Sequence, residues 1–335
     1  MLYITTRNNK DAYTAHRALH ENTAPDGGVY VPFQMPLFSA QEIAYFASIG
    51  FSKTVAEILN KFFSCGLSGW DVDFCIGRNA VRFESMTRRI IVAELWHNPQ
   101  GLYEHMCSAL YEKITEQRSD SISDWFTIAF HIAILFGLYS ELCRTNAIVP
   151  SDAIDLSTMA DNLSLPLAAL YAKRMGLPIG TIIFTCEENS GIWDLVHLGE
   201  LSPAVANSNI LGFERLIHTL LGHAAIADMH NSVNAKRTFR ISEEIFPEFN
   251  NGLFCAVTGK DRCAQNVNSI YRSNSYILDP QAALSVGGLQ DFRSKTGESK
   301  QTLVLSCVSP IKCVAQIAEA TGISQEKLAV LMKNL

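Results

Sequence analysis

Two acidic residues, a histidine and an asparagine are the side chains of this 335-residue sequence that best fit acid–base chemistry in a cleft. Glu104 and Asp161 are candidates for a carboxylate pair, which can share a proton and shift the pKa of one partner. His97 and Asn162 lie in the same two segments of the chain. Ser306, which ends a predicted strand, completes the candidate cleft. The alternative is that Glu104 is a solvated helix residue, as most glutamates are.

Other chemistry is not indicated by residue spacing. His16 and His20 share a helix face at a spacing that metal sites use, but the sequence shows no third ligand. His218 and His223 are five apart and do not share a face. The nine cysteines are scattered without a CxxC pair, and GxSxG, GxGxxG, P-loop and HExxH motifs are missing. We therefore expect no metal.

Composition predicts a globular chain, with 48% hydrophobic and 18% charged residues. The net charge is −6 and no basic block is longer than Arg88–Arg89, so we expect no nucleic-acid partner.

The segment from Trp125 to Tyr139 reads as a buried helix too short and too interrupted to cross a membrane, so no membrane association is expected. The start MLYITTRNNKD turns polar quickly, and the odd number of scattered cysteines fits a reducing compartment. We expect a cytoplasmic protein.

The stretch from residue 155 to 189 contains the clearest structural signals and must position the cleft. Ser164 is a candidate helix cap, Pro166 fits the first turn, and Gly176 ends the helix. The β-branched and aromatic run Ile179–Phe184 then predicts a buried parallel strand. Loop, helix and strand in this order make half of a βαβ unit, and such sheets bind ligands at the carboxyl ends of their strands.

Several phrases resemble one enzyme family. They are TTR at 5–7, APDGGVYVP at 24–32, AKRMGLPI at 172–179, EEN at 187–189 and YILDP at 276–280. They are similar to threonine synthase, a pyridoxal-phosphate enzyme of the tryptophan synthase β-like fold. The resemblance implies an α/β fold-type II protein with a parallel or mixed sheet flanked by helices and a small N-terminal α/β region. It also implies an N-terminal region at 1–90 and a remnant of the catalytic domain at 91–335.

The resemblance fails at three functional places. The segment from Glu94 to Pro99 resembles the family phrase ELFHGPTLAFKD, and continuing it without a gap puts Glu104 where the family has its Schiff-base lysine. A carboxylate cannot form an imine.

The family phosphate loop, GNFGD or GNFGN, falls on DNLSL, whose carboxylate faces the place of the cofactor phosphate. The residues concerned are Asp161, Asn162, Leu163, Ser164 and Leu165. From Glu104 to Asp161 the chain has one or two helices where the family has its mobile small domain, which is therefore largely deleted.

These losses predict a pseudoenzyme without pyridoxal phosphate and without catalytic residues. We expect it to act by binding a small molecule or a protein partner, including a second copy through the surface that the missing domain exposes. One alternative is an enzyme that uses the remodelled cleft of His97, Glu104, Asp161 and Asn162. Another is retained cofactor binding through a different lysine, such as Lys173 or Lys312.

Overall fold

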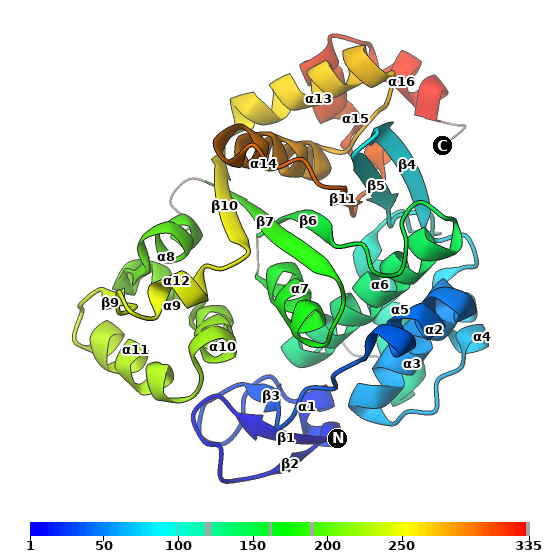
Figure 1. The fold of residues 1–335 in the computed structure, drawn as a ribbon. Helices are drawn as coiled ribbons and strands as arrows, with labels where there is room; N and C mark the ends of the chain where they lie inside the picture. Colours follow the sequence, from blue (N-terminus) through cyan, green and yellow to red (C-terminus); the bar gives the residue numbers. More distant parts are fainter. Residues whose placement is uncertain (99, 118–121, 161–162, 188–190, 333–335) are drawn as a thin grey trace.

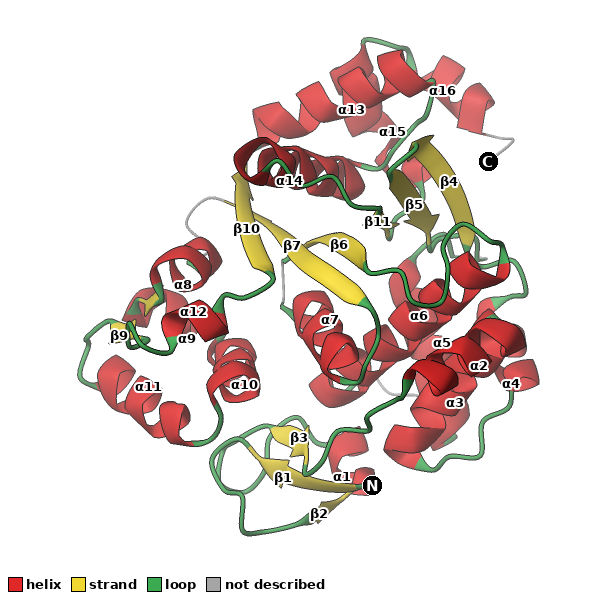
Figure 2. Ribbon diagram, viewed as in Figure 1, coloured by secondary structure: helices red, strands yellow, loops and turns green. Residues whose placement is uncertain are grey.

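The computed structural model describes residues 1–98, 100–117, 122–160, 163–187 and 191–332. Its centre is a six-stranded sheet in the order β10-β7-β6-β11-β5-β4 (Figures 1 and 2). The strands are β4 (Arg82–Thr87), β5 (Ile90–Glu94), β6 (Ile154–Met159), β7 (Ile179–Glu187), β10 (Leu253–Thr258) and β11 (Thr302–Ser306). All neighbours pair in parallel except β4, which is antiparallel to β5 at the sheet edge. The expected parallel or mixed sheet is confirmed.

The inner strands are buried along most of their length because helices cover both faces of the sheet. Every residue of β5 and of β11 is buried. In the register of the sheet, Val304 of β11 is paired with Val92 of β5 on one side and with Ser157 of β6 on the other. This continuous burial is what the β-branched runs in the sequence predict.

Two groups of helices flank the sheet. On one face α14 packs against β6, β7, β10 and β11, with α13, α15 and α16 beyond it. These are α13 (Lys260–Asn274), α14 (Pro280–Thr296), α15 (Val314–Thr321), preceded by a 3-10 turn at Pro310–Cys313, and α16 (Gln325–Met332). The other face carries α5 (Tyr103–Thr115), α6 (Asp124–Arg144), α7 (Ser164–Arg174) and α8 (Ile192–Leu198).

The N-terminal region adds a small antiparallel sheet and four helices, and three of the helices pack near α6. Its elements are β1 (Leu2–Thr5), β2 (Tyr13–Thr14), α1 (Ala15–His20), β3 (Tyr30–Pro32), α2 (Ala40–Ile49), α3 (Phe51–Phe63) and α4 (Gly69–Ile76). A helical group follows α8, at the left of Figure 1. It contains β8 (Glu200–Leu201), α9 (Pro203–Ser208), α10 (Ile210–Leu221), α11 (Ala224–Asn234), β9 (Phe239–Arg240) and α12 (Phe246–Phe249).

Helix α6 is the central helix of the larger hydrophobic cluster. It is long and apolar enough to cross a membrane, but 89% of its most apolar window is buried inside the protein. Gly137 permits close packing with α3, since a Cβ there would lie 2.9 Å from side-chain atoms of Phe51 and Val55. A helix that is apolar all round is expected in a protein core, and α6 occupies one.

Three helices do not begin at the nearby side chain that could cap them. The first helix begins at Ala15, because residues 13–14 pair with β1 instead of continuing a helix from Asp11. Ser52 is not a cap but lies inside α3, where its hydroxyl donates to Asp73 at 2.5 Å. Ser164 is the first helical residue of α7, and the N-cap is Leu163 with a φ of 63°.

Candidate functional site

A pocket of about 230 Å³ lies at the carboxyl ends of β6 and β11, where the sheet meets the start of α7. Residues of six elements and their adjoining loops line it: Tyr103, Glu104, Cys107, Ser108, Ile122, Thr127, His131, Thr158, Met159, Ser164, Leu165, Gln281, Leu305 and Cys307. This is the edge at which parallel sheets bind ligands. It is therefore the candidate functional site.

Glu104 lies in the first turn of α5, on the wall of this pocket. The helix start is held next to β11, because the Tyr103 amide donates to the Cys307 carbonyl at 3.0 Å. Glu104 is exposed, and a carboxylate in a first turn is stabilised by the positive end of the helix dipole. None of the described residues that line the pocket is a lysine.

His131 of α6 forms the inner wall and is hydrogen-bonded at both ring nitrogens. The Tyr103 hydroxyl lies 2.8 Å from Nδ1, and the Ser164 hydroxyl lies 3.3 Å from Nε2. Burial lowers the pKa of His131 to about 3, so the ring is neutral at physiological pH. A neutral ring with a pKa this low is a weak base, and His131 is suited to hold Tyr103 and Ser164 in place.

The predicted cleft residues His97 and Ser306 lie in a polar network outside the pocket lining. His97 Nε2 is 2.6 Å from Glu94 Oε2, and its ring stacks on Trp96. The Trp96 indole donates to Ser306 Oγ at 3.0 Å, and Ser306 in turn donates to Asp279 at 2.6 Å. The network thus connects the ends of β5 and β11 to the N-terminus of α14.

Asp279 is the N-cap of α14 and is fully buried, with Oδ1 accepting from the Ala282 amide at 3.0 Å. Burial raises its pKa to about 6, although hydrogen bonds from Ser306 and the helix amides act in the opposite direction. A carboxyl with a raised folded-state pKa favours folding when protonated. Its ionisation therefore costs stability as the pH rises from the unfolded value near 4 through about 6.

Replacing Asp279 with asparagine should remove this pH dependence while keeping an oxygen for the cap. We expect the free energy of unfolding of Asp279→Asn, relative to wild type, to rise by roughly 1–2 kcal/mol between about pH 5 and about pH 7.5. Urea titrations of both proteins at the two pH values measure this difference. A difference that does not change with pH would show that Asp279 does not ionise in this range.

The remaining predicted residues separate into three groups. Asp161 and Asn162 lie outside the described residues, and so does the predicted pair of Glu104 with Asp161. Leu163 is buried, while Ser164 and Leu165 line the pocket. The resemblance predicts a glycine of the family phosphate loop at the position of Ser164, whose side chain lines the pocket and contacts His131.

The alternative lysines do not line the pocket. Lys173 lies near the opposite end of α7, where its ammonium group donates to the Gly180 carbonyl at 2.5 Å. Lys312 is exposed, with its Cε close to Gly101. Lys113, which lies further along α5 than Glu104, does not line the pocket either and forms an ion pair with Asp71 at 2.9 Å.

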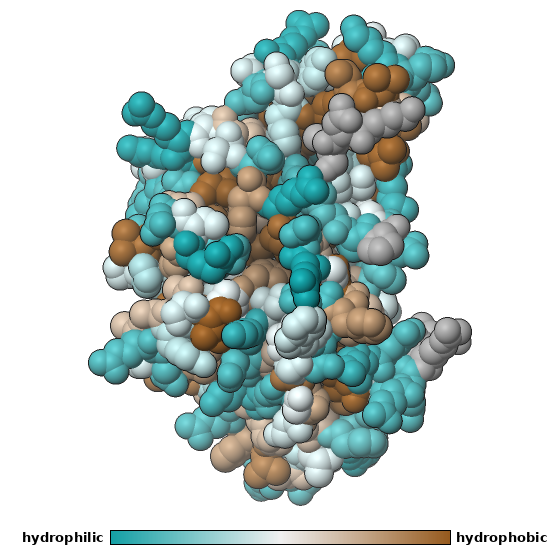
Figure 3. Space-filling model, turned by 90° about the vertical axis from the view of Figure 1, so that its right-hand side faces the viewer, coloured by the Kyte–Doolittle hydropathy of each residue, from teal (hydrophilic) through white to brown (hydrophobic). Residues whose placement is uncertain are grey.

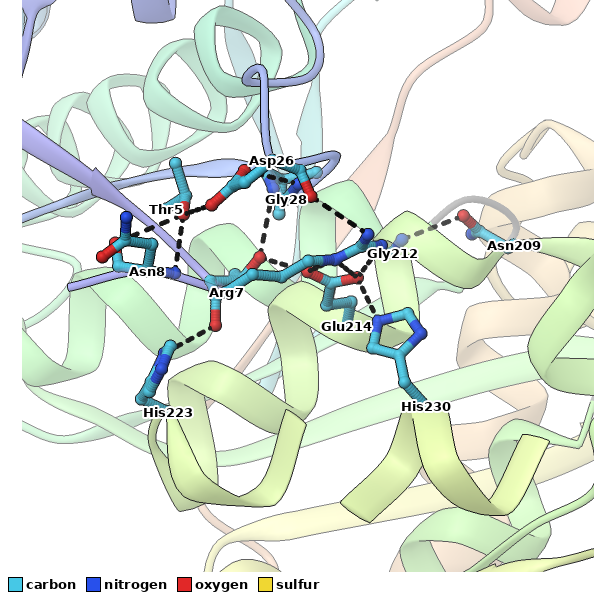
Figure 4. A network of polar contacts seen from close by, with 12 residues as sticks. Thr5, Arg7, Asn8, Asp26, Gly28, Asn209, Gly212, Glu214, His223 and His230 are labelled. Carbon is cyan, nitrogen blue, oxygen red and sulfur yellow. Dashed lines mark hydrogen bonds and ion pairs between the residues drawn. The ribbon is translucent and has the colours of Figure 1, made fainter. Parts of the chain in front are cut away.

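A second polar network, centred on Glu214 of α10, was not predicted from the sequence (Figure 4). Glu214 is fully buried and accepts hydrogen bonds from the Thr6 hydroxyl, from Arg7 at 2.9 Å and from His230 at 2.7 Å. Burial by itself would raise the pKa of Glu214, but the hydrogen bonds from Arg7, Thr6 and His230 lower it overall. The carboxylate therefore joins the N-terminal sheet to α10 and α11.

The phrases TTR and APDGG meet beside this carboxylate. The Thr5 hydroxyl donates to Asp26 at 2.5 Å, and the other Asp26 oxygen accepts from the Gly28 amide at 2.9 Å. Gly27 has a φ of 77°, a conformation that glycine adopts without strain. Their place beside Glu214 gives these phrases a structural role. Residues 208–215, SNILGFER, resemble a family helix that contains an SNxER phrase. This resemblance points to Glu214 but does not identify the residues that bind it.

Comparison with known proteins points to one family. Residues 2–78 match the family model described as threonine synthase N terminus. The chain is 22% identical over 175 residues to "Threonine synthase-like 1" of Homo sapiens, in a match that covers 48% of this chain and 24% of that protein. The matched part thus spans about a quarter of the length of these relatives. Threonine synthase of Pseudomonas aeruginosa is 23% identical over 433 positions, covering 97% of this chain and 91% of the relative.

Solved structures agree in fold. Threonine synthase from yeast superposes with a TM-score of 0.81 at 15% identity, covering 96% of this chain and 90% of that one. Threonine synthase from Brucella melitensis, solved with pyridoxal phosphate bound, gives a TM-score of 0.74 at 18% identity, covering 96% and 91%. These similarities establish the fold-type II architecture, and they confirm the resemblance stated from the sequence.

Proposed function

We propose that this threonine synthase-like chain has lost pyridoxal phosphate-dependent catalysis and acts by binding a small molecule or a protein partner. One observation carries the proposal. In the pocket that the fold would use for the cofactor, the described lining residues include a carboxylate, Glu104, and no amine. Covalent attachment of pyridoxal phosphate needs a lysine within reach of its aldehyde.

The phosphate end of the pocket also fits the cofactor poorly. Ser164, the first residue of α7, places a side chain where the family has a glycine. Backbone amides bind a phosphate well only when it can approach them closely. The residues present therefore do not fit pyridoxal phosphate, and we assign no reaction step to it.

A difference in ligand-induced stabilisation tests this proposal. Pyridoxal phosphate should leave the melting temperature of this chain unchanged, because only a ligand that binds the folded state raises it. Threonine synthase of Pseudomonas aeruginosa, treated in the same way, serves as the positive control. A saturable rise for this chain would count against the proposal.

Binding of a protein partner is the second candidate. Trp70 and Phe74 of α4 are exposed by 73% and 87%, although large aromatic side chains are usually buried or at interfaces. Figure 3 shows hydrophobic side chains gathered at the upper end of one face, near α16, where Val330 and Leu331 are exposed by 62% and 43%. Sedimentation of the purified chain tests the simplest version, a homodimer, which a monomer mass at high concentration would rule out.

An active enzyme remains the alternative, using the remodelled cleft or a lysine outside it. Lys173 and Lys312 are the lysines concerned. We also propose a cytoplasmic location, in keeping with the scattered cysteines of the sequence.

A further inference from the structure

The charge of the pocket at the ends of β6 and β11 is set by one side chain. Glu104 is the one charged side chain among the described residues that line it. No described residue forms an ion pair with Glu104 within 4.0 Å. His131 also lines the pocket and would be positive if it were protonated, but burial lowers its pKa to about 3 and keeps it neutral. The described part of the pocket is therefore negative.

Three hydroxyl groups of the pocket lining donate their protons to backbone carbonyls. Ser108 donates its proton to the Glu104 carbonyl at 3.1 Å, and Thr127 donates to the Ser123 carbonyl at 3.3 Å. Thr158 donates to the Met159 carbonyl at 3.4 Å. A hydroxyl whose proton is used in this way presents oxygen lone pairs to its other neighbours. Three such oxygens belong to residues that line the same pocket as Glu104.

We infer that this pocket binds a small molecule through a primary ammonium group that faces Glu104. An ammonium group has three N–H donors and no acceptor, which matches a carboxylate and several hydroxyl oxygens. About 230 Å³ has room for roughly seven water-sized groups, so the ligand is small. The inference rests on the proposed function, because bound pyridoxal phosphate would occupy the same space and bring a negative phosphate instead of a positive ammonium group.

Three probes of one length separate charge from shape. Butylamine hydrochloride, butanol and sodium butyrate are titrated at equal ionic strength into the full chain, and binding is followed by saturation-transfer NMR. We expect saturable binding of butylamine, at least tenfold weaker binding of butanol, and no binding of butyrate. Glu104→Gln should weaken butylamine at least tenfold and bring it level with butanol.

Glu112→Gln is the matched control, since Glu112 is an exposed glutamate on the same helix and does not line the pocket. It should bind butylamine as the wild type does. Both positions are exposed, so both variants should fold, and an unchanged melting temperature checks this. Equal binding of the three probes, a preference for butyrate, or wild-type affinity in Glu104→Gln would overturn the inference.

The inference and the proposed function fail in different ways. If butylamine does not bind and pyridoxal phosphate does not stabilise the chain, only the ammonium inference is overturned. If pyridoxal phosphate stabilises the chain and blocks butylamine, the proposed function itself is wrong.

Discussion

Replacing Glu214 with alanine should lower the free energy of unfolding by about 3–5 kcal/mol, the usual cost of removing one partner from a buried ion pair. Glu214 is fully buried and accepts hydrogen bonds from Thr6, Arg7 and His230. Without it, the Thr6 hydroxyl and the partly buried Arg7 guanidinium lose their acceptor. The N-terminal sheet would also lose its polar contact with α10.

Urea denaturation of Glu214→Ala and of Glu112→Ala measures this effect. Glu112 is exposed on α5, so its substitution should change stability by no more than about 0.5 kcal/mol. Similar small effects of the two substitutions would contradict the central role of Glu214. The lowered pKa of Glu214 adds a direction: the stability it contributes is present at neutral pH and is lost as the pH falls through its folded-state value.

Trp125→Ala should have an effect of similar size, about 3–5 kcal/mol, because it opens a cavity in the core. Trp125 lies in the first turn of α6 and is 1% exposed, with edge contacts to Tyr3, Phe62 and Tyr171. Its indole donates to the Tyr3 hydroxyl at 3.0 Å, and that hydroxyl donates to the Phe62 carbonyl at 3.1 Å. One side chain thus connects the N-terminal strand, α3, α6 and α7.

The same substitution at an exposed position is the control. Trp70→Ala removes an equal number of atoms from a side chain that is 73% exposed, and should cost less than about 1 kcal/mol. Thermal and urea unfolding of both variants give the comparison. Equal destabilisation by the two would show that Trp125 is not part of a close-packed core.

The sequence predicted the elements whose burial follows a simple pattern. Strand β7 contains the β-branched and aromatic run Ile179–Phe184, and α6 reads as an apolar helix, because each is largely buried. Helix starts were harder. Gly50 and Leu163 are N-caps without a side-chain cap hydrogen bond, whereas the nearby serines that resemble caps lie inside the helices.

The polar networks could not be predicted, because their members are far apart in the chain. Glu214 is 207 residues from Arg7, and Ser306 is 210 residues from Trp96. No local pattern encodes such pairs. The resemblance predicts that Glu104 stands at the family lysine position, and the structure places Glu104 on the pocket wall. It did not identify Tyr103, whose contact with His131 depends on how α5 packs against α6.

The central claim is that no lysine of this chain forms an imine with pyridoxal phosphate. Its most direct test is incubation of the purified chain with pyridoxal phosphate, followed by an absorbance spectrum, borohydride reduction and mass analysis of peptides. We expect no imine band and no reduced adduct on any lysine, because the described residues that line the pocket include Glu104 and no lysine. A saturable adduct on one lysine, with Lys312 or Lys173 the first to inspect, would contradict this account and restore the enzyme interpretation.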